Sequence, residues 1–186
     1  IDDSVALADL SKRLLLNVFL LWLIFHTAKY SNFLTLIIWY LYSTQFQFWG
    51  YTGLGHEALH GRVFSNKSAN RFLFIFCSAL TWNNSAMFAD SHAIHHRSAF
   101  SPEDSEANSE TRWGFWHIVG YSLIDIPTLG RRVYYTLVNS FGYYPDFSLL
   151  SPKYARAARL NLLVNLIIYS ALYSITQDLV LTALAS

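Results

Sequence analysis

The sequence predicts an all-α integral membrane protein with about three transmembrane helices and further helices at the lipid–water boundary. Of its 186 residues, 53% are hydrophobic and 17% aromatic, whereas only 13% are charged. This balance is more apolar than that of an average soluble domain. Long apolar stretches separated by short polar breaks are the second observation, and an uneven distribution of basic residues among those breaks is the third.

Three apolar stretches have about the 20 residues that crossing a bilayer core requires. The first runs from Leu14 to Tyr30 and follows the basic pair Lys12 and Arg13. The second, Phe33 to Leu54, returns after a short polar break, and the third runs from Leu160 to about Leu184. The stretch Phe72 to Trp82 is too short to cross, and Trp113 to Tyr144 mixes aromatic and charged residues. Both suit helices at the membrane interface.

The basic residues predict the orientation of these spans. Of the 13 Lys and Arg, only Lys29 falls on the side reached after the first span. The positive-inside rule therefore places the N-terminus and residues Gly61 to Arg159 on the cytoplasmic face. The net charge of +1 without a basic run excludes nucleic-acid binding. The single cysteine, Cys77, suits a small core residue.

Five of the seven histidines lie in two short segments, which we call box one (His56 to His60) and box two (His92 to His96). In a helix, residues three and four apart share one face, so each box would direct its imidazoles to one place. Neutral imidazole binds iron, zinc, copper or nickel. The sequence therefore predicts a metal site with ligands His56, His60, His92, His95 and His96. His26 and His117 stand alone and are interpreted as structural.

Box one by itself also fits the His-Glu-x-x-His pattern of zinc proteases, in which the glutamate activates water. The extended protease pattern requires Gly and His where Val63 and Asn66 stand. A later Asp-Gly pair, expected of an intramembrane zinc protease, is also absent. A tetrahedral zinc site would leave box two unexplained. The intramembrane zinc protease is thus an alternative with less support.

With both boxes in this order and setting, the sequence resembles the membrane fatty acid desaturase superfamily, which includes sterol-type hydroxylases, alkane hydroxylases and carotenoid ketolases. That family has His-x3-4-His after its second span and His-x2-3-His-His about thirty residues later, which box one and box two match. Asp104-Ser105-Glu106 stands where the family often has Asp-Pro-Asp or Asp-Pro-Glu. The likeness covers roughly residues 12 to 184.

The family's third histidine box is absent, because His117 is the only histidine after box two. We therefore expect residues 1–186 to form a single membrane desaturase-like domain that lacks its C-terminal part. The missing part would contain a fourth span and the third histidine box. A naturally shortened relative that has lost part of its site is the other interpretation.

The resemblance implies two non-haem iron ions held chiefly by histidine, O2 as oxidant, and a membrane lipid or acyl substrate. It also implies an external electron donor, either a ferredoxin or a cytochrome b5-like protein. Glu57, Asp104 and Glu106 are candidates to accept the far N–H of a ligating imidazole. For Asp90 a solvated charge or helix cap is the more ordinary role, and Asn83-Asn84 suit a turn.

The outcome of the implied reaction, desaturation or hydroxylation, stays open, as does the substrate. A carotenoid ketolase or hydroxylase is one alternative within the superfamily. A non-catalytic, desaturase-derived subunit of a larger membrane complex is another.

Overall fold

The computed structural model describes residues 2–50, 53–99, 101–102, 104 and 126–184. The regular elements in these residues are helices, which confirms the predicted all-α class. The chain divides into two compact units. Unit 1 comprises Ile1–Thr81 and Leu163–Ser186, and unit 2 comprises Trp82–Leu162.

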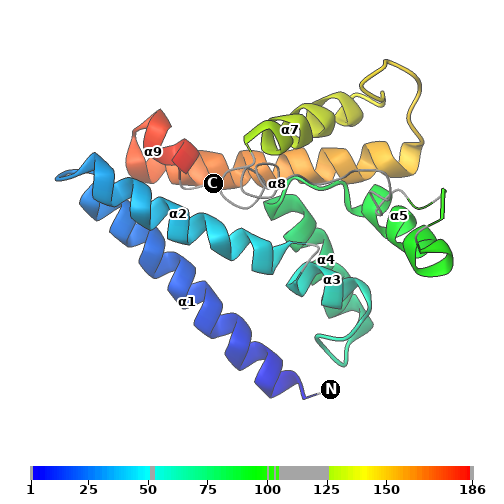
Figure 1. Cartoon of the computed structure of the whole chain (residues 1–186), viewed down its shortest axis with the longest axis horizontal. Coiled ribbons are helices and arrows are strands. Elements are labelled where there is room, and N and C mark those ends of the chain that lie inside the picture. Colours follow the sequence, from blue (N-terminus) through cyan, green and yellow to red (C-terminus); the bar gives the residue numbers. More distant parts are fainter. Residues whose placement is uncertain (1, 51–52, 100, 103, 105–125, 185–186) are drawn as a thin grey trace. The chain divides into compact units, whose positions relative to one another are not determined.

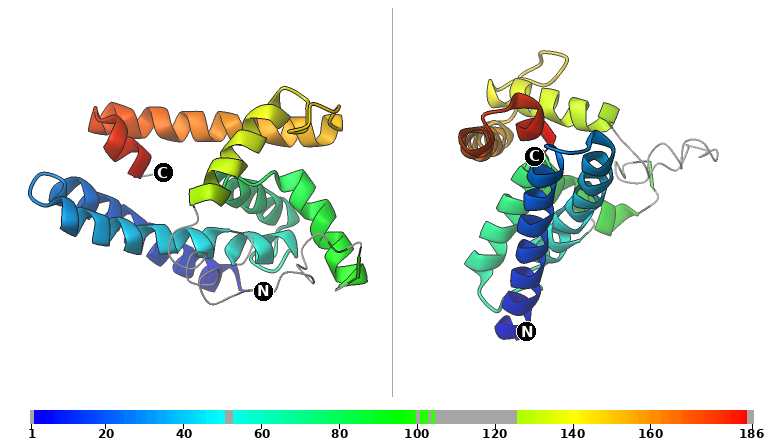
Figure 2. Two further views of the ribbon diagram at one scale, coloured as in Figure 1. Left: turned by 45° about the horizontal axis from the view of Figure 1, so that its top comes forward. Right: turned by 90° about the vertical axis from the view of Figure 1, so that its left-hand side faces the viewer.

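Unit 1 begins with a hairpin of α1 (Asp3–Thr27) and α2 (Asn32–Trp49), which lie side by side (Figures 1 and 2). The Asp2 side chain caps α1 by accepting the Ser4 N–H at 2.9 Å. The buried residues between the two helices are Leu20, Ile24, Ile38 and Tyr42. The first apolar stretch is therefore helical as far as Thr27, and the second as far as Trp49.

The turn after α2 corrects the predicted second span, which was expected to continue to Leu54. The helix ends at Trp49, and a separate short helix, α3 (Leu54–Leu59), begins five residues later. The Gly55 N–H donates to the Gly50 carbonyl at 3.1 Å. A Cβ at Gly53 would lie 2.3 Å from the Phe48 carbonyl oxygen, so this close turn requires glycine.

Helix α4 (Lys67–Leu80) packs against α3 within unit 1. Its N-cap, Asn66, accepts the N–H groups of Ser68 and Ala69 at 2.8 and 3.1 Å. The predicted interfacial stretch Phe72 to Trp82 lies largely in this helix. Of the stretch Trp113 to Tyr144, residues 113–125 lie outside the described part, and residues 126–140 form α7 (Ile126–Ser140).

Unit 2 contains α5 (Ser85–Ser98), α7 and the beginning of α8 (Pro152–Thr176), which continues into unit 1. The predicted third span was expected to be one stretch from Leu160 to Leu184. Instead α8 ends at Thr176, and Gln177 adopts the left-handed region at φ 52°. The Asp178 carboxylate then accepts the first N–H groups of α9 (Leu179–Leu184). A polar pair therefore ends the helix where counting apolar residues predicted continuation.

Among the described residues, α8 is long and apolar enough to cross a membrane by itself. A second span is reached only if α4 and α5 together count as one broken span. Membrane crossing by α1 and α2 therefore stays a prediction.

Candidate metal centre

Box one lies in unit 1, where α3 carries His56 and ends at Leu59, directly before its C-cap His60. The two Nε2 atoms are 3.3 Å apart, and the rings meet edge to face with centroids 4.6 Å apart. This is the contact expected of residues four apart in a helix. Both side chains are half-buried.

A backbone motif fixes the position of His60 at the end of α3. Gly61 has φ +69°, and its N–H donates to the Ala58 carbonyl at 3.0 Å. The Arg62 N–H donates to the Glu57 carbonyl at 2.9 Å. These two bonds form a Schellman motif, which needs a left-handed residue directly after the helix. Gly61 provides that residue without steric cost.

The Glu57 carboxylate lies beside the far nitrogen of His56. Its Oε1 is 2.9 Å from His56 Nδ1, while the Glu57 side chain remains 46% exposed. A proton on Nδ1 leaves the lone pair on Nε2, the atom that faces His60. The contact therefore suits a carboxylate that orients a ligating imidazole.

Box two lies in unit 2 on α5, whose N-cap Asn84 accepts the Met87 N–H at 3.2 Å. His92 is buried and His96 is exposed, and their Nε2 atoms are 2.9 Å apart. The ring of His95 lies 5.9 Å from each of the other two rings. The three imidazoles of box two thus lie together on one helix.

Asp104 provides the corresponding carboxylate for box two. Its Oδ2 is 2.9 Å from His95 Nδ1, and its side chain is completely buried. The contact joins two residues nine positions apart. Asp104 was a candidate for this role because of its position in the sequence after box two. Each box thus has one imidazole whose Nδ1 faces a carboxylate.

The nitrogen separations fit a shared metal ion in each pair. Two nitrogens bound to one ion at about 2.1 Å lie roughly 3.0 Å apart at right angles and roughly 3.4 Å apart in a tetrahedron. The observed Nε2–Nε2 distances, 3.3 Å in box one and 2.9 Å in box two, are close to these values. Without an ion, one ring of each pair donates its Nε2–H to the Nε2 lone pair of the other ring, and with an ion both Nε2 lone pairs would face the metal. The histidine pairs are therefore consistent with metal binding.

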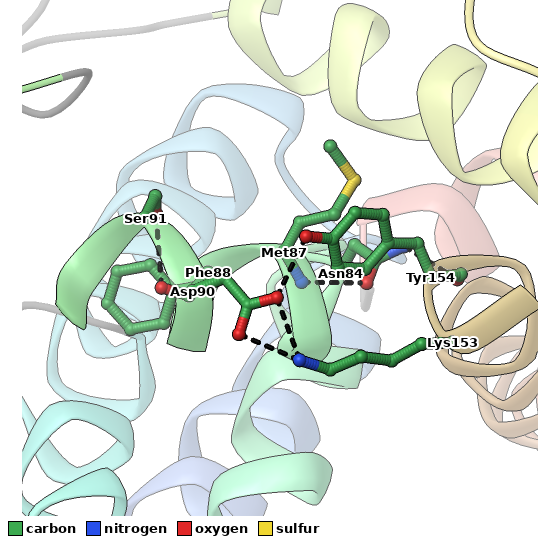
Figure 3. Close-up of polar contacts among 7 residues, drawn as sticks. All are labelled: Asn84, Met87, Phe88, Asp90, Ser91, Lys153 and Tyr154. Atoms are coloured by element: carbon green, nitrogen blue, oxygen red, sulfur yellow. Dashed lines mark hydrogen bonds and ion pairs between the residues drawn. The ribbon is translucent and has the colours of Figure 1, made fainter. Parts of the chain in front are cut away.

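A polar network anchors α5 to the beginning of α8 within unit 2 (Figure 3). The Lys153 ammonium lies 2.7 Å from both Asp90 carboxylate oxygens, and the Tyr154 hydroxyl donates to Asp90 at 2.8 Å. The Asn84 amide donates to the Tyr154 carbonyl at 2.9 Å. We call Asn84, Asp90, Lys153 and Tyr154 the Asp90 network.

The Asp90 network was not predicted from the sequence. The hydrogen bonds from Lys153 and Tyr154 hold the pKa of the Asp90 carboxyl below its ordinary value. Asp90 had been interpreted as a solvated charge or cap, and its partners are 63 and 64 residues away. No local pattern marks such a distant pair. The Asn83 carbonyl likewise accepts the Asn161 amide at 2.8 Å.

Three remaining predicted residues lie away from the boxes or outside the description. Glu106 and His117 are outside the described residues. His26 stacks on Trp22 with ring centroids 5.3 Å apart and a 15° interplanar angle. Among the described residues, its ring contacts are with Trp22 of α1 and with Tyr30 in the turn after it, and neither belongs to box one.

The fold and the site together define a helical protein with two histidine pairs suited to a metal ion. The chain belongs to the fatty acid desaturase family, whose model matches residues 31–184. Comparison with curated proteins and with solved structures finds no match.

Membership in this family supports a desaturase-like oxidoreductase function in general. It also implies a lipid substrate and O2, together with association with a membrane. The apolar helix α8 agrees with that association.

Proposed function

We propose that this chain provides histidine ligands for a non-haem di-iron centre that oxidises C–H bonds of lipid acyl chains with O2. The observation that carries the proposal is the pair of Nε2 contacts, 3.3 Å in box one and 2.9 Å in box two. The proposed ligands are His56, His60, His92, His95 and His96. Family membership supports the lipid substrate and O2.

Removing hydrogen from an unactivated methylene group is beyond any side-chain acid or base. Bound iron would supply the O2 activation that this step needs. The contribution of the chain's own residues is to hold and orient. Glu57 and Asp104 keep the proton on Nδ1 of His56 and His95, which leaves each Nε2 as the metal-binding atom.

Asp104 is the stronger of the two proposed orienting groups. Its side chain is fully buried, whereas the Glu57 side chain is 46% exposed. A buried carboxylate without water holds its imidazole partner in one orientation, and its negative charge raises the basicity of that imidazole. The contact of Glu57 with His56 also favours an orienting role over the water-activating role of a zinc protease.

We further infer that α1, α2 and α8 cross the membrane, with the N-terminus and both boxes on the cytoplasmic side. The distribution of Lys and Arg supports this orientation. Electrons would come from an external donor such as a ferredoxin or a cytochrome b5-like protein. The chain would act as one desaturase-like domain, and further ligands implied by the family would come from outside these five histidines.

Counting metal in two variants tests whether both boxes serve one centre. The full chain is purified, loaded anaerobically with Fe(II), and its iron per chain measured. If the boxes share one centre, His60→Ala and His96→Ala each remove nearly all bound iron. If the boxes form separate sites, each substitution removes only about half of the iron bound per chain. His117→Ala, outside both boxes, is the control and retains iron.

The same measurement separates the other classes of function. Two irons per unmodified chain support the proposal. Selective binding of a single zinc would instead support the protease. Failure to bind iron or zinc would contradict the enzyme and favour a non-catalytic subunit.

A further inference from the structure

A cavity of about 360 Å³ lies in unit 1, apart from the residues of the histidine boxes. One wall comes from α1 and the turn that follows it. Its residues are Trp22, Phe25, His26 and Lys29. This wall combines two aromatic rings with two groups that can carry positive charge.

The opposite wall comes from the end of α8 and from α9, which also belong to unit 1. It contains Ile175, Thr176 and Leu181. The Thr176 hydroxyl is already engaged, at 3.1 Å from the Asp178 carbonyl and 2.8 Å from the Thr182 hydroxyl. This wall is therefore mainly apolar toward a ligand.

Among the described residues, the lining includes Lys29 and His26 and contains no carboxylate. The acidic residue nearest in sequence to its α8–α9 wall is Asp178. That carboxylate accepts the N–H groups of Val180 and Leu181 at 2.7 and 3.1 Å, which commits it to capping α9. The Lys29 ammonium and the His26 ring therefore favour an anion.

The apolar surroundings indicate that this anion has a hydrocarbon chain. Trp22 is 55% exposed and Ile175 is 73% exposed. The cavity lies at the end of α8, the helix able to cross a bilayer, and such an end meets the lipid–water boundary. The His26 ring stacks on Trp22 and lies at a 55° tilt to Tyr30, with both centroid distances 5.3 Å. Aromatic and lysine side chains are typical of this boundary.

We propose that this cavity binds the headgroup of an anionic membrane phospholipid. Lys29 and His26 donate to the headgroup phosphate, while the beginning of an acyl chain lies against Trp22 and Ile175. The inference is independent of the proposed di-iron function, because no residue of either histidine box takes part. It assigns a lipid site to residues of unit 1 that the metal chemistry does not use.

Lipid titration of the purified full chain in neutral detergent tests the proposal. The probes are phosphatidylglycerol, phosphatidylcholine with the same acyl chains, and inorganic phosphate. Phosphatidylglycerol is expected to bind most tightly. Lys29→Gln should weaken that binding about fivefold, because one lysine near an anionic lipid contributes about 1 kcal/mol. Lys12→Gln, which changes an exposed lysine on α1 outside the cavity lining, should leave this binding unchanged.

The position of the acyl chain is tested separately with phosphatidylglycerol brominated on that chain, which quenches nearby tryptophan fluorescence. Trp22→Phe should remove most of the quenching. Equal affinity for phosphatidylcholine, or no effect of Lys29→Gln, would overturn the proposal. So would quenching that persists in Trp22→Phe. Inorganic phosphate that competes at the affinity of the lipid would assign the site to free phosphate instead.

Discussion

The two histidine boxes present almost the same pair geometry, but different interactions hold them. Box one lies on a helix of six residues whose N-cap, Gly53, makes no side-chain cap bond. Close backbone turns at Gly53, Gly55 and Gly61 hold it. Box two lies on a helix of 14 residues that Asn84 caps and Asp90 anchors. Box one should therefore be sensitive to added volume, and box two to loss of polar partners.

Gly53→Ala should have the largest effect, because its Cβ would lie 2.3 Å from the Phe48 carbonyl oxygen, a backbone atom that cannot rotate away. We expect a loss of about 1–3 kcal/mol in the free energy of unfolding, the usual cost of overpacking. Iron binding should fall with it. Thermal unfolding and iron content of the purified chain measure both.

Gly130→Ala is the matched control for that substitution. Gly130 lies in α7, and a Cβ there meets nothing within 4 Å. Alanine should stabilise this helix by up to about 1 kcal/mol, because it is the better helix former. If Gly53→Ala left both stability and iron unchanged, the backbone account of box one would be wrong.

Removing the charge of each orienting carboxylate compares the boxes directly. Asp104→Asn should weaken iron binding about 10- to 100-fold, as is usual for the partner of a ligating histidine. Glu57→Gln should cost less, because water can replace a side chain that is 46% exposed. Titration of the apo chain with Fe(II) gives both affinities. A larger loss for Glu57→Gln would show that burial does not set the strength of these contacts.

The features that the sequence predicted are those that depend on local spacing. The contacts of His56 with His60 and of His92 with His96 follow from one helical turn. Two boundaries were wrong, at Leu54 and at Leu184, because an apolar stretch does not reveal a backbone turn inside it. The break before α3 depends on how closely Gly53 approaches Phe48, which only the folded backbone determines.

Interactions between distant residues were the part that sequence could not provide. Lys153 and Asp90 are ordinary charged residues in the sequence, and nothing in the intervening residues pairs them. Asp104 was proposed only because it occupies the position of a family motif. Its burial, which makes it the stronger candidate than Glu57, is a property of the folded chain.

The ion pair of the Asp90 network should contribute less to the free energy of unfolding than Glu57 or Asp104 contributes to the free energy of metal binding. Asp90 and Lys153 are 42% and 54% exposed, and exposed ion pairs contribute about 0.2–1 kcal/mol. A double-mutant cycle of Asp90→Asn and Lys153→Met, followed by chemical unfolding, should give a coupling energy in that range. A coupling near zero would mean that Asn84 and Tyr154 hold α5 without the ion pair.

The smallest expected effect concerns the loop between box one and α4, where the Asp3 carboxylate accepts the Ser65 N–H and hydroxyl, both at 2.7 Å. These bonds hold the pKa of Asp3 below its ordinary value of 3.8. We call these two hydrogen bonds between Asp3 and Ser65 the Asp3 tether. The Asp3 carboxylate binds a proton more readily when the tether is broken. The tether is therefore fully present above pH about 4 and is lost as the pH falls through the lowered pKa.

Hydrogen exchange of the Ser65 amide, corrected for its intrinsic rate, should show protection at about pH 5 that declines toward pH 3. Asp3→Asn should lack the pH-dependent part, because its side chain does not titrate in this range. Protection that fell by the same amount in Asp3→Asn would assign the change to another group. In that case the Asp3 charge would have no role near box one. Backbone geometry alone would then hold box one, in contrast to the polar partners that hold box two.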